Sequence, residues 1–230
     1  MEGARCVALT QPRRGHGVSV TAYYLGRALV ERGLRVLLVD LTGRRERLRV
    51  LLEREPVKNL GLWAPPSTRP DTLPALLQRA RQETLGKVDV LLLDADAPLL
   101  HSIRGLAAGI DYVTIFVEAG DAGLRDADQL GAQFDDTPPP HGRVGVALCR
   151  TDGRNAEELP LQTPERRLPV LGGFPADYLL AASDEYTVKD AEVKSPHDDY
   201  LIAIRQLARA LAEIVPLRRI ANPASSGAPA

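Results

Sequence analysis

The chain has 230 residues, which is enough for one sizeable α/β domain with its own hydrophobic core. Hydrophobic residues make up 44% and charged residues 26%, and the formal net charge of −1 gives no support for a strongly nucleic-acid-binding surface. No stretch approaches the roughly 20 apolar residues that a membrane-spanning helix needs. The N-terminus enters a strand at once, without a signal-peptide hydrophobic region, so we expect a cytoplasmic protein.

Short apolar runs alternate with helical stretches along the chain, which predicts βαβ units and a mostly parallel sheet. The runs are apolar throughout, as is typical of strands covered on both faces. Strands are expected at 5–9, 35–40, 88–94, 112–117, 144–149 and, more briefly, 168–171. Helices are expected at 19–32, before Gly33, and at 198–214, where apolar residues follow a helical period. The fold class is therefore an α/β, doubly wound single domain flanked by helices.

The remaining segments are expected to be loops or tails. The Pro-rich stretches 64–70 and 135–142 and the polar run 151–167 are typical of surface loops. We expect one domain over residues 1–216, followed by a disordered tail over 217–230, whose small polar residues cannot form a core. The two cysteines, Cys6 and Cys149, lie in apolar runs, which favours buried thiols over a disulfide or a redox role.

The most informative segment is 10–22, with the sequence TQPRRGHGVSVTA. It follows a strand, contains Gly15 and Gly17, and opens a helix with the hydroxyl residue Ser19. Glycines let backbone N–H groups approach phosphate oxygens, a helix N-terminus favours an anion, and a hydroxyl there binds Mg²⁺. The segment therefore predicts a phosphate-binding loop, although Ser19 also suits a role as helix cap.

This segment resembles the deviant Walker A motif, KGGxGK[ST], of the ParA/MinD-type P-loop ATPases. The likeness continues in the strand that ends at Asp40, in the switch II-like segment 88–100, and in residues 170–177, so it covers roughly residues 4–214. The resemblance implies a P-loop domain that binds ATP–Mg²⁺, forms a homodimer and acts on a protein cargo or adaptor. It implies that Asp40 and Asp94 are the catalytic switch carboxylates and that Ser19 is the Mg²⁺ ligand, although both aspartates also suit turn or capping roles. It also assigns a nucleotide-binding loop, consisting of Arg13, Arg14, Gly15, Gly17, Val18, Ser19 and Val20.

The chain departs from this family pattern at several positions, so the Walker A motif is degenerate. Val18 occupies the place of the lysine that neutralises the β- and γ-phosphates. One lost charge-assisted hydrogen bond lowers nucleotide affinity roughly ten- to a hundredfold. Arg13 replaces the signature lysine that reaches the partner's nucleotide, and Arg14 replaces a glycine; both arginines suit either phosphate contact or plain solvation. Cys149 stands where MinD-like proteins usually have an adenine-reading asparagine.

A second, partial resemblance is to the bacterial tyrosine kinases of polysaccharide export. It rests on the loop GHGVS and on Arg44 and Arg45 after the second strand. Those kinases carry a C-terminal tyrosine cluster, which the tail of this chain lacks.

Three functions follow from these patterns. The favoured one is a pseudo-ATPase, a dimerising scaffold or positioning factor with weak or absent hydrolysis. The alternatives are an active ATP-dependent partition switch and an accessory of polysaccharide synthesis or secretion. The arginine-rich run 44–49 suggests non-specific DNA binding by a dimer, or simply a solvated helix face. The pair Arg218 and Arg219 is too short for a membrane anchor, and none is expected.

Overall fold

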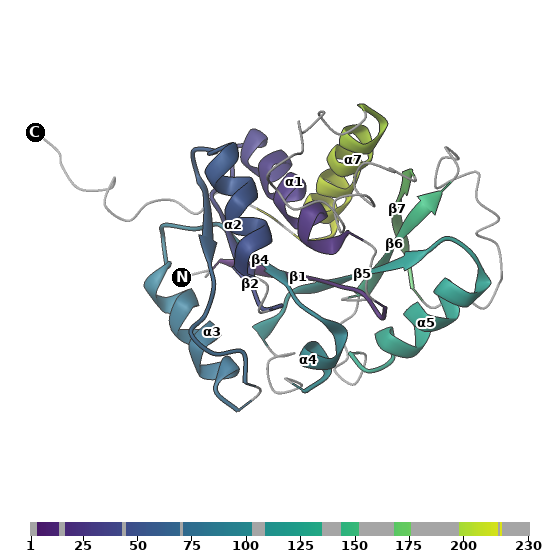
Figure 1. The fold of residues 1–230 in the computed structure, drawn as a ribbon, viewed down its shortest axis with the longest axis horizontal. Coiled ribbons are helices and arrows are strands. Elements are labelled where there is room, and N and C mark those ends of the chain that lie inside the picture. Colours follow the sequence, from purple (N-terminus) through teal and green to yellow (C-terminus); the bar gives the residue numbers. More distant parts are fainter. Residues whose placement is uncertain are drawn as a thin grey trace, which may run out of the picture.

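The computed structural model describes residues 4–13, 17–42, 45–69, 71–102, 109–134, 144–151, 168–175, 198–215 and 217. These residues form a seven-stranded sheet with helices on both faces (Figure 1). Every strand pair in it is parallel. The predicted α/β fold class is therefore confirmed.

The sheet is built around β1 and β4, which lie at its centre. The strand order is β3-β2-β4-β1-β5-β6-β7. The strands are β1 (Arg5–Thr10), β2 (Val36–Asp40), β3 (Leu60–Trp63), β4 (Val90–Asp94), β5 (Tyr112–Glu118), β6 (Val144–Thr151) and β7 (Val170–Pro175). Because β1 lies between β4 and β5, the loop that leaves β1 emerges at the middle of the carboxyl edge, where ligands bind in open parallel sheets.

The helices form two layers that bury opposite faces of the sheet (Figure 1). One face is covered by α1 (Val18–Glu31), α2 (Arg45–Arg54) and α7 (Asp198–Ile214). The other is covered by α3 (Leu73–Glu83), α4 (Ala97–Ser102) and α5 (Asp121–Gly131). Alternate strand residues enter the two cores: Leu9 packs on the α1 side, whereas Ala8 packs on the α5 side.

Most of the elements expected from the sequence are present, with ends shifted by a few residues. The structure adds β3, α2, α3, α4 and α5, which the apolar-run pattern did not indicate. The described part of the stretch 64–70 contains no helix or strand, whereas 135–142 and nearly all of 151–167 lie outside the described residues. Leu217 is partly buried against the core, one residue beyond the expected end of the domain. Among the described residues, no helix is long and apolar enough to cross a membrane.

Candidate functional site

Three neighbouring strands bring polar side chains together at the carboxyl edge of the sheet. Asp40 ends β2 and Asp94 ends β4, and these two residues are direct register partners. Thr10 ends β1, where the preceding Leu9 is paired with Asp94. The strand ends are tied together just beyond this point: the backbone N–H of Leu41 donates to the carbonyl of Asp94 (2.9 Å), and that of Ala95 donates to the carbonyl of Leu9 (3.1 Å). The carboxylates therefore lie on a rigid part of the fold.

The loop after β1 returns to the sheet through a left-handed glycine. Gly17 has φ 70° and ψ 21° and is the N-cap of α1, and its carbonyl accepts the N–H of Thr21 at 2.9 Å. No side-chain hydrogen bond caps the helix. The reading of Ser19 as the helix cap is therefore wrong, because α1 already begins at Val18. Without a side-chain cap, the first N–H groups of α1 suit an anion.

The side chain at the lysine position belongs to the hydrophobic core. Val18 is 3% exposed and Val20 is 5% exposed, and both pack in the core layer between α1 and the sheet. A valine in this layer supplies neither charge nor a hydrogen-bond donor. A phosphate at this loop would thus be held by backbone N–H groups, together with a metal ion or a cationic side chain that does not come from position 18.

The two carboxylates leave the sheet on the face covered by α1. This follows from strand alternation, because Leu38 and Leu92, two residues earlier, pack on that face. Asp40 and Asp94 are each 2% exposed. Oδ1 of Asp40 accepts the N–H of Thr42 (2.9 Å) and its hydroxyl (2.7 Å), whereas Oδ2 is buried without a hydrogen-bond partner among the described residues.

A buried carboxylate oxygen without a donor is costly unless a cation or a proton meets it. The carboxylates of these two aspartates, on adjacent strands, are the kind of oxygen ligands that Mg²⁺ takes. Ser19 lies in the first turn of α1, and its hydroxyl is a candidate further ligand. The carboxylate side of the site therefore fits a magnesium-bound phosphate group, whereas the loop side lacks the lysine. Sequence reasoning found Asp40 and Asp94 but not Thr42, which stands two residues after Asp40 in the spacing of an Asx turn.

Arg13 is an exposed loop residue with a partner on α5. Its side chain is 73% exposed and its Nε lies 3.0 Å from Oδ2 of Asp126. No pattern in the sequence points to Asp126. Arg14, Gly15 and His16 lie outside the described residues.

Other residues singled out from the sequence take structural positions. Cys6 and Cys149 are both buried with free thiols, as predicted. Burial raises the pKa of the Cys6 thiol to about 12, which keeps it protonated and unreactive. The carbonyl of Asp96 accepts the N–H groups of Leu99 and Leu100 as α4 begins. Residues 176 and 177, the last two of the family-like segment 170–177, lie outside the described residues.

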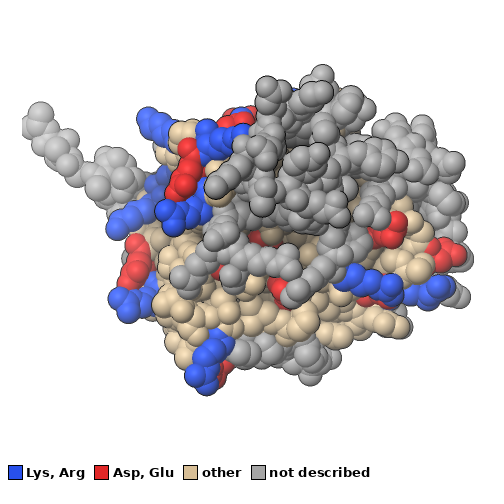
Figure 2. All heavy atoms as spheres, in the orientation of Figure 1, with Lys and Arg blue, Asp and Glu red and all other residues tan. Residues whose placement is uncertain are grey.

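The basic run expected after β2 forms part of α2. Arg44 and the side chains of Arg45 and Arg47 lie outside the described residues. The structure therefore does not describe the arginine pair on which the resemblance to the tyrosine kinases partly rests. Arg49 is paired with Glu53 in an exposed (i, i+4) ion pair. On the face drawn in Figure 2, described Lys and Arg side chains alternate with Asp and Glu side chains instead of gathering in one patch.

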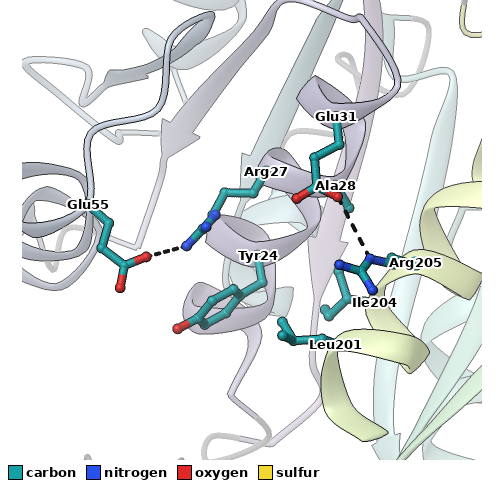
Figure 3. A pocket seen from close by; sticks show the side chains of 8 residues that line it. All are labelled: Tyr24, Arg27, Ala28, Glu31, Glu55, Leu201, Ile204 and Arg205. Atoms are coloured by element: carbon teal, nitrogen blue, oxygen red, sulfur yellow. Dashed lines mark hydrogen bonds and ion pairs between the residues drawn. The ribbon is translucent and has the colours of Figure 1, made fainter. Parts of the chain in front are cut away.

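A cavity of about 310 Å³ lies away from this edge, between α1 and α7 (Figure 3). Two ion pairs span it: one joins Arg27 to Glu55, and the other joins Glu31 to Arg205 at 3.8 Å. Its lining residues come from α1, from α7 and from the residue that follows α2, and are Tyr24, Arg27, Ala28, Glu31, Glu55, Leu201, Ile204 and Arg205. The charged groups drawn there face one another across the cavity, and it holds none of the predicted site residues.

No family model matches the chain, and no curated protein matches it in sequence. Several solved structures share its fold. A chain of the MinC:MinD cell division protein complex from Aquifex aeolicus is 18% identical, with a TM-score of 0.62 over 91% of this chain and 96% of that one. A ParA family ATPase from Chlorobium tepidum TLS is 18% identical, with a TM-score of 0.60 over 89% of this chain and 98% of that one.

A third similar structure is a cobyrinic acid a,c-diamide synthase from Mycobacterium smegmatis, solved with a bound ATP analog and magnesium. It is 20% identical, with a TM-score of 0.62 over 96% of this chain and 99% of that one. The chain thus has the ParA/MinD-like P-loop fold that its sequence pattern predicts. Because the sequence identities are only 18–20%, the similarity to these structures establishes the fold alone.

Proposed function

We propose that this chain is a ParA/MinD-like pseudo-ATPase, a dimerising scaffold or positioning factor with weak or absent ATP hydrolysis. The observation that carries the proposal is Val18, which is 3% exposed and packs in the core where the fold family places its catalytic lysine. Phosphoryl transfer depends mainly on positive charge placed around the transferring group, so the lost lysine reduces turnover more than binding. The buried pair Asp40 and Asp94 supports residual Mg²⁺–nucleotide binding.

The proposed partners are a second copy of this chain and a protein cargo or adaptor. Non-specific DNA remains a further candidate partner of the dimer, through arginines of α2. The ion pair between Arg49 and Glu53 reduces the positive charge that α2 offers to DNA. A protein partner is therefore favoured over DNA.

The test compares the wild-type chain with Val18→Lys. ATP–Mg²⁺ is titrated by calorimetry, the mass is followed by light scattering, and phosphate release is measured in parallel. We expect Val18→Lys to bind ATP–Mg²⁺ roughly ten- to a hundredfold more tightly than the wild type, because it restores one charge-assisted hydrogen bond. Its turnover should also rise above that of the wild-type chain.

Val18→Met is the matched control, because methionine gives a long side chain without an amine. It should bind nucleotide no better than the wild type. Sustained phosphate release by the wild-type chain, as fast as that of a Val18→Lys chain that does hydrolyse ATP, would contradict the pseudo-ATPase proposal. An equal gain in the methionine variant would show that side-chain length, not charge, limits binding.

An active nucleotide switch is the second candidate, and the paired carboxylates favour it. Asp40 and Asp94 are register partners at the strand ends, and Oδ2 of Asp40 is buried without a described donor. A fold that had lost its nucleotide entirely has no evident need for this arrangement. Submillimolar ATP–Mg²⁺ binding by the wild-type chain, accompanied by a doubling of mass and by turnover, would establish the switch in place of the scaffold.

A further inference from the structure

The loop arginine is held by a carboxylate that is distant in sequence. Nε of Arg13 lies 3.0 Å from Oδ2 of Asp126, and Nη2 of Arg13 donates to Oδ1 of Asp126 at 3.4 Å. The two contacts use both carboxylate oxygens and two adjacent guanidinium nitrogens. This two-point geometry is the one in which arginine also binds phosphate groups.

The position of Asp126 places this contact on the α5 side of the sheet. Leu130, one turn after Asp126, packs against the sheet face opposite to α1. β1 and β5 are neighbouring strands, and the ion pair joins Arg13, three residues after β1, to Asp126 in α5, the helix that follows β5. The ion pair thus directs the Arg13 guanidinium toward α5, whereas the N-terminus of α1 belongs to the other layer.

The ion pair is open to exchange with a competing anion. The Arg13 side chain is 73% exposed and that of Asp126 is 26% exposed, so water and small anions reach the pair. Exposed ion pairs contribute little to stability and are screened by salt. A phosphate group at the α1 N-terminus offers the same guanidinium more negative charge than one carboxylate does.

We propose that Asp126 is a positioning residue that holds Arg13 against α5 while the loop is free of anion, and that it competes with a phosphate-bearing ligand for the guanidinium. The inference deepens the proposed function, because it rests on the loop as a phosphate site. It also gives a local reason for low affinity beyond the lost lysine: an anion that recruits Arg13 must first displace Asp126.

The experiment uses inorganic pyrophosphate as the probe and the Nε–H signal of Arg13 as the readout. The signal is followed by ¹⁵N NMR in the full chain and is assigned by its loss in Arg13→Ala. We expect Asp126→Asn to shift this signal before any anion is added. The pyrophosphate concentration at half-saturation should fall about two- to fivefold, the effect of removing one exposed ion pair.

Asp128→Asn is the matched control, because it removes the same charge from the same helix two residues further on. We expect it to leave the half-saturation concentration close to that of the wild type. Equal effects of the two variants would show that the total negative charge of α5, and not the contact with Asp126, sets the pyrophosphate affinity. That outcome would overturn the inference. A signal that pyrophosphate or Asp126→Asn does not move would also overturn it.

Failure of the proposed function gives a different result from failure of this inference. Rapid ATP turnover by the wild-type chain would reject the pseudo-ATPase, yet the pyrophosphate titrations would still decide the role of Asp126. Conversely, an unchanged half-saturation concentration in Asp126→Asn would reject the positioning role and leave the effect of Val18 on turnover as it stands.

Discussion

Gly17 and Val18 are adjacent, but only Gly17 keeps a property that a phosphate-binding loop needs. Gly17 keeps the left-handed backbone that such a loop uses, whereas Val18 replaces the charged side chain by a core residue. The backbone requirement of the loop is thus preserved without its charge. This combination is what a fold retained for its shape, and not for catalysis, is expected to contain.

Gly17→Ala tests the backbone requirement at the residue scale. A Cβ added to Gly17 meets nothing within 4 Å, but φ is +70° there, so the substitution introduces strain without a clash. We expect the free energy of unfolding to fall by about 1 kcal/mol, because an L side chain is disfavoured in the left-handed region. Thermal or urea denaturation measures the change.

Gly172→Ala in β7 is the matched control for this substitution. An added Cβ also meets nothing within 4 Å there, and Gly172 does not have a positive φ. It should leave stability unchanged or raise it slightly, because alanine restricts the unfolded chain. A loss at Gly172 as large as at Gly17 would argue against backbone strain as the cause.

At the scale of elements, an ion pair fixes the amino ends of β2 and β4, opposite the candidate site. The Asp89 side chain is fully buried and accepts the N–H of Arg35 at 2.8 Å, its Nε at 3.0 Å and its Nη2 at 2.7 Å. We expect Asp89→Ala to lower the free energy of unfolding by about 3–5 kcal/mol, because it leaves a largely buried guanidinium without its anion. Urea denaturation measures the loss.

The charge of Arg35 in this pair should not change between neutral and moderately alkaline pH. The hydrogen bond with Asp89 raises the pKa of the Arg35 guanidinium, a group whose ordinary pKa is already high. A group whose folded-state pKa is raised gives its full stabilisation below the unfolded value, so the contribution of Arg35 is lost only in strongly alkaline solution, as the pH rises through the raised pKa. Glu213→Ala, which breaks the exposed pair with Arg209, is the control and should change stability too little to measure.

The sequence predicts the central elements better than the peripheral ones, for physical reasons. Strands buried on both faces, such as β4, are continuous apolar runs, which few other structures require. The edge strand β3 has four residues beside a Pro-rich stretch, and its side chains are mostly half-buried. α5 contains three aspartates and two glycines, so its narrow apolar stripe is hard to distinguish from a loop.

The candidate site shows the same division. Asp40 and Asp94 were predicted from the resemblance to the family's switch carboxylates, and they end two paired parallel strands at one edge of the sheet. The contact between Arg13 and Asp126 joins residues 113 positions apart and depends on the strand order, which the sequence pattern did not indicate. The burial of Val18 likewise depends on the packing of α1 against the sheet. The features of the candidate site that could not be predicted from the sequence are therefore the contacts between separate elements.

At the scale of the whole molecule, the limit of the folded domain is a testable quantity. Val215, beyond the end of α7, is 4% exposed, and Leu217 packs against the same core. Residues 218–230 are mostly small residues and include a single large apolar side chain, so we expect them to contribute no packing. Two truncated chains, ending at residues 217 and 214, distinguish the contributions of these segments.

The chain ending at 217 should unfold within roughly 1 °C of the full chain, since it keeps both apolar contacts. The chain ending at 214 loses Val215 and Leu217, which corresponds to about 2–4 kcal/mol of buried apolar surface and to a Tm lower by about 5–10 °C. Scanning calorimetry measures both. A drop in Tm for the chain ending at 217 would place the end of the domain within the last thirteen residues, and the tail would then be part of the fold that any partner of this protein meets.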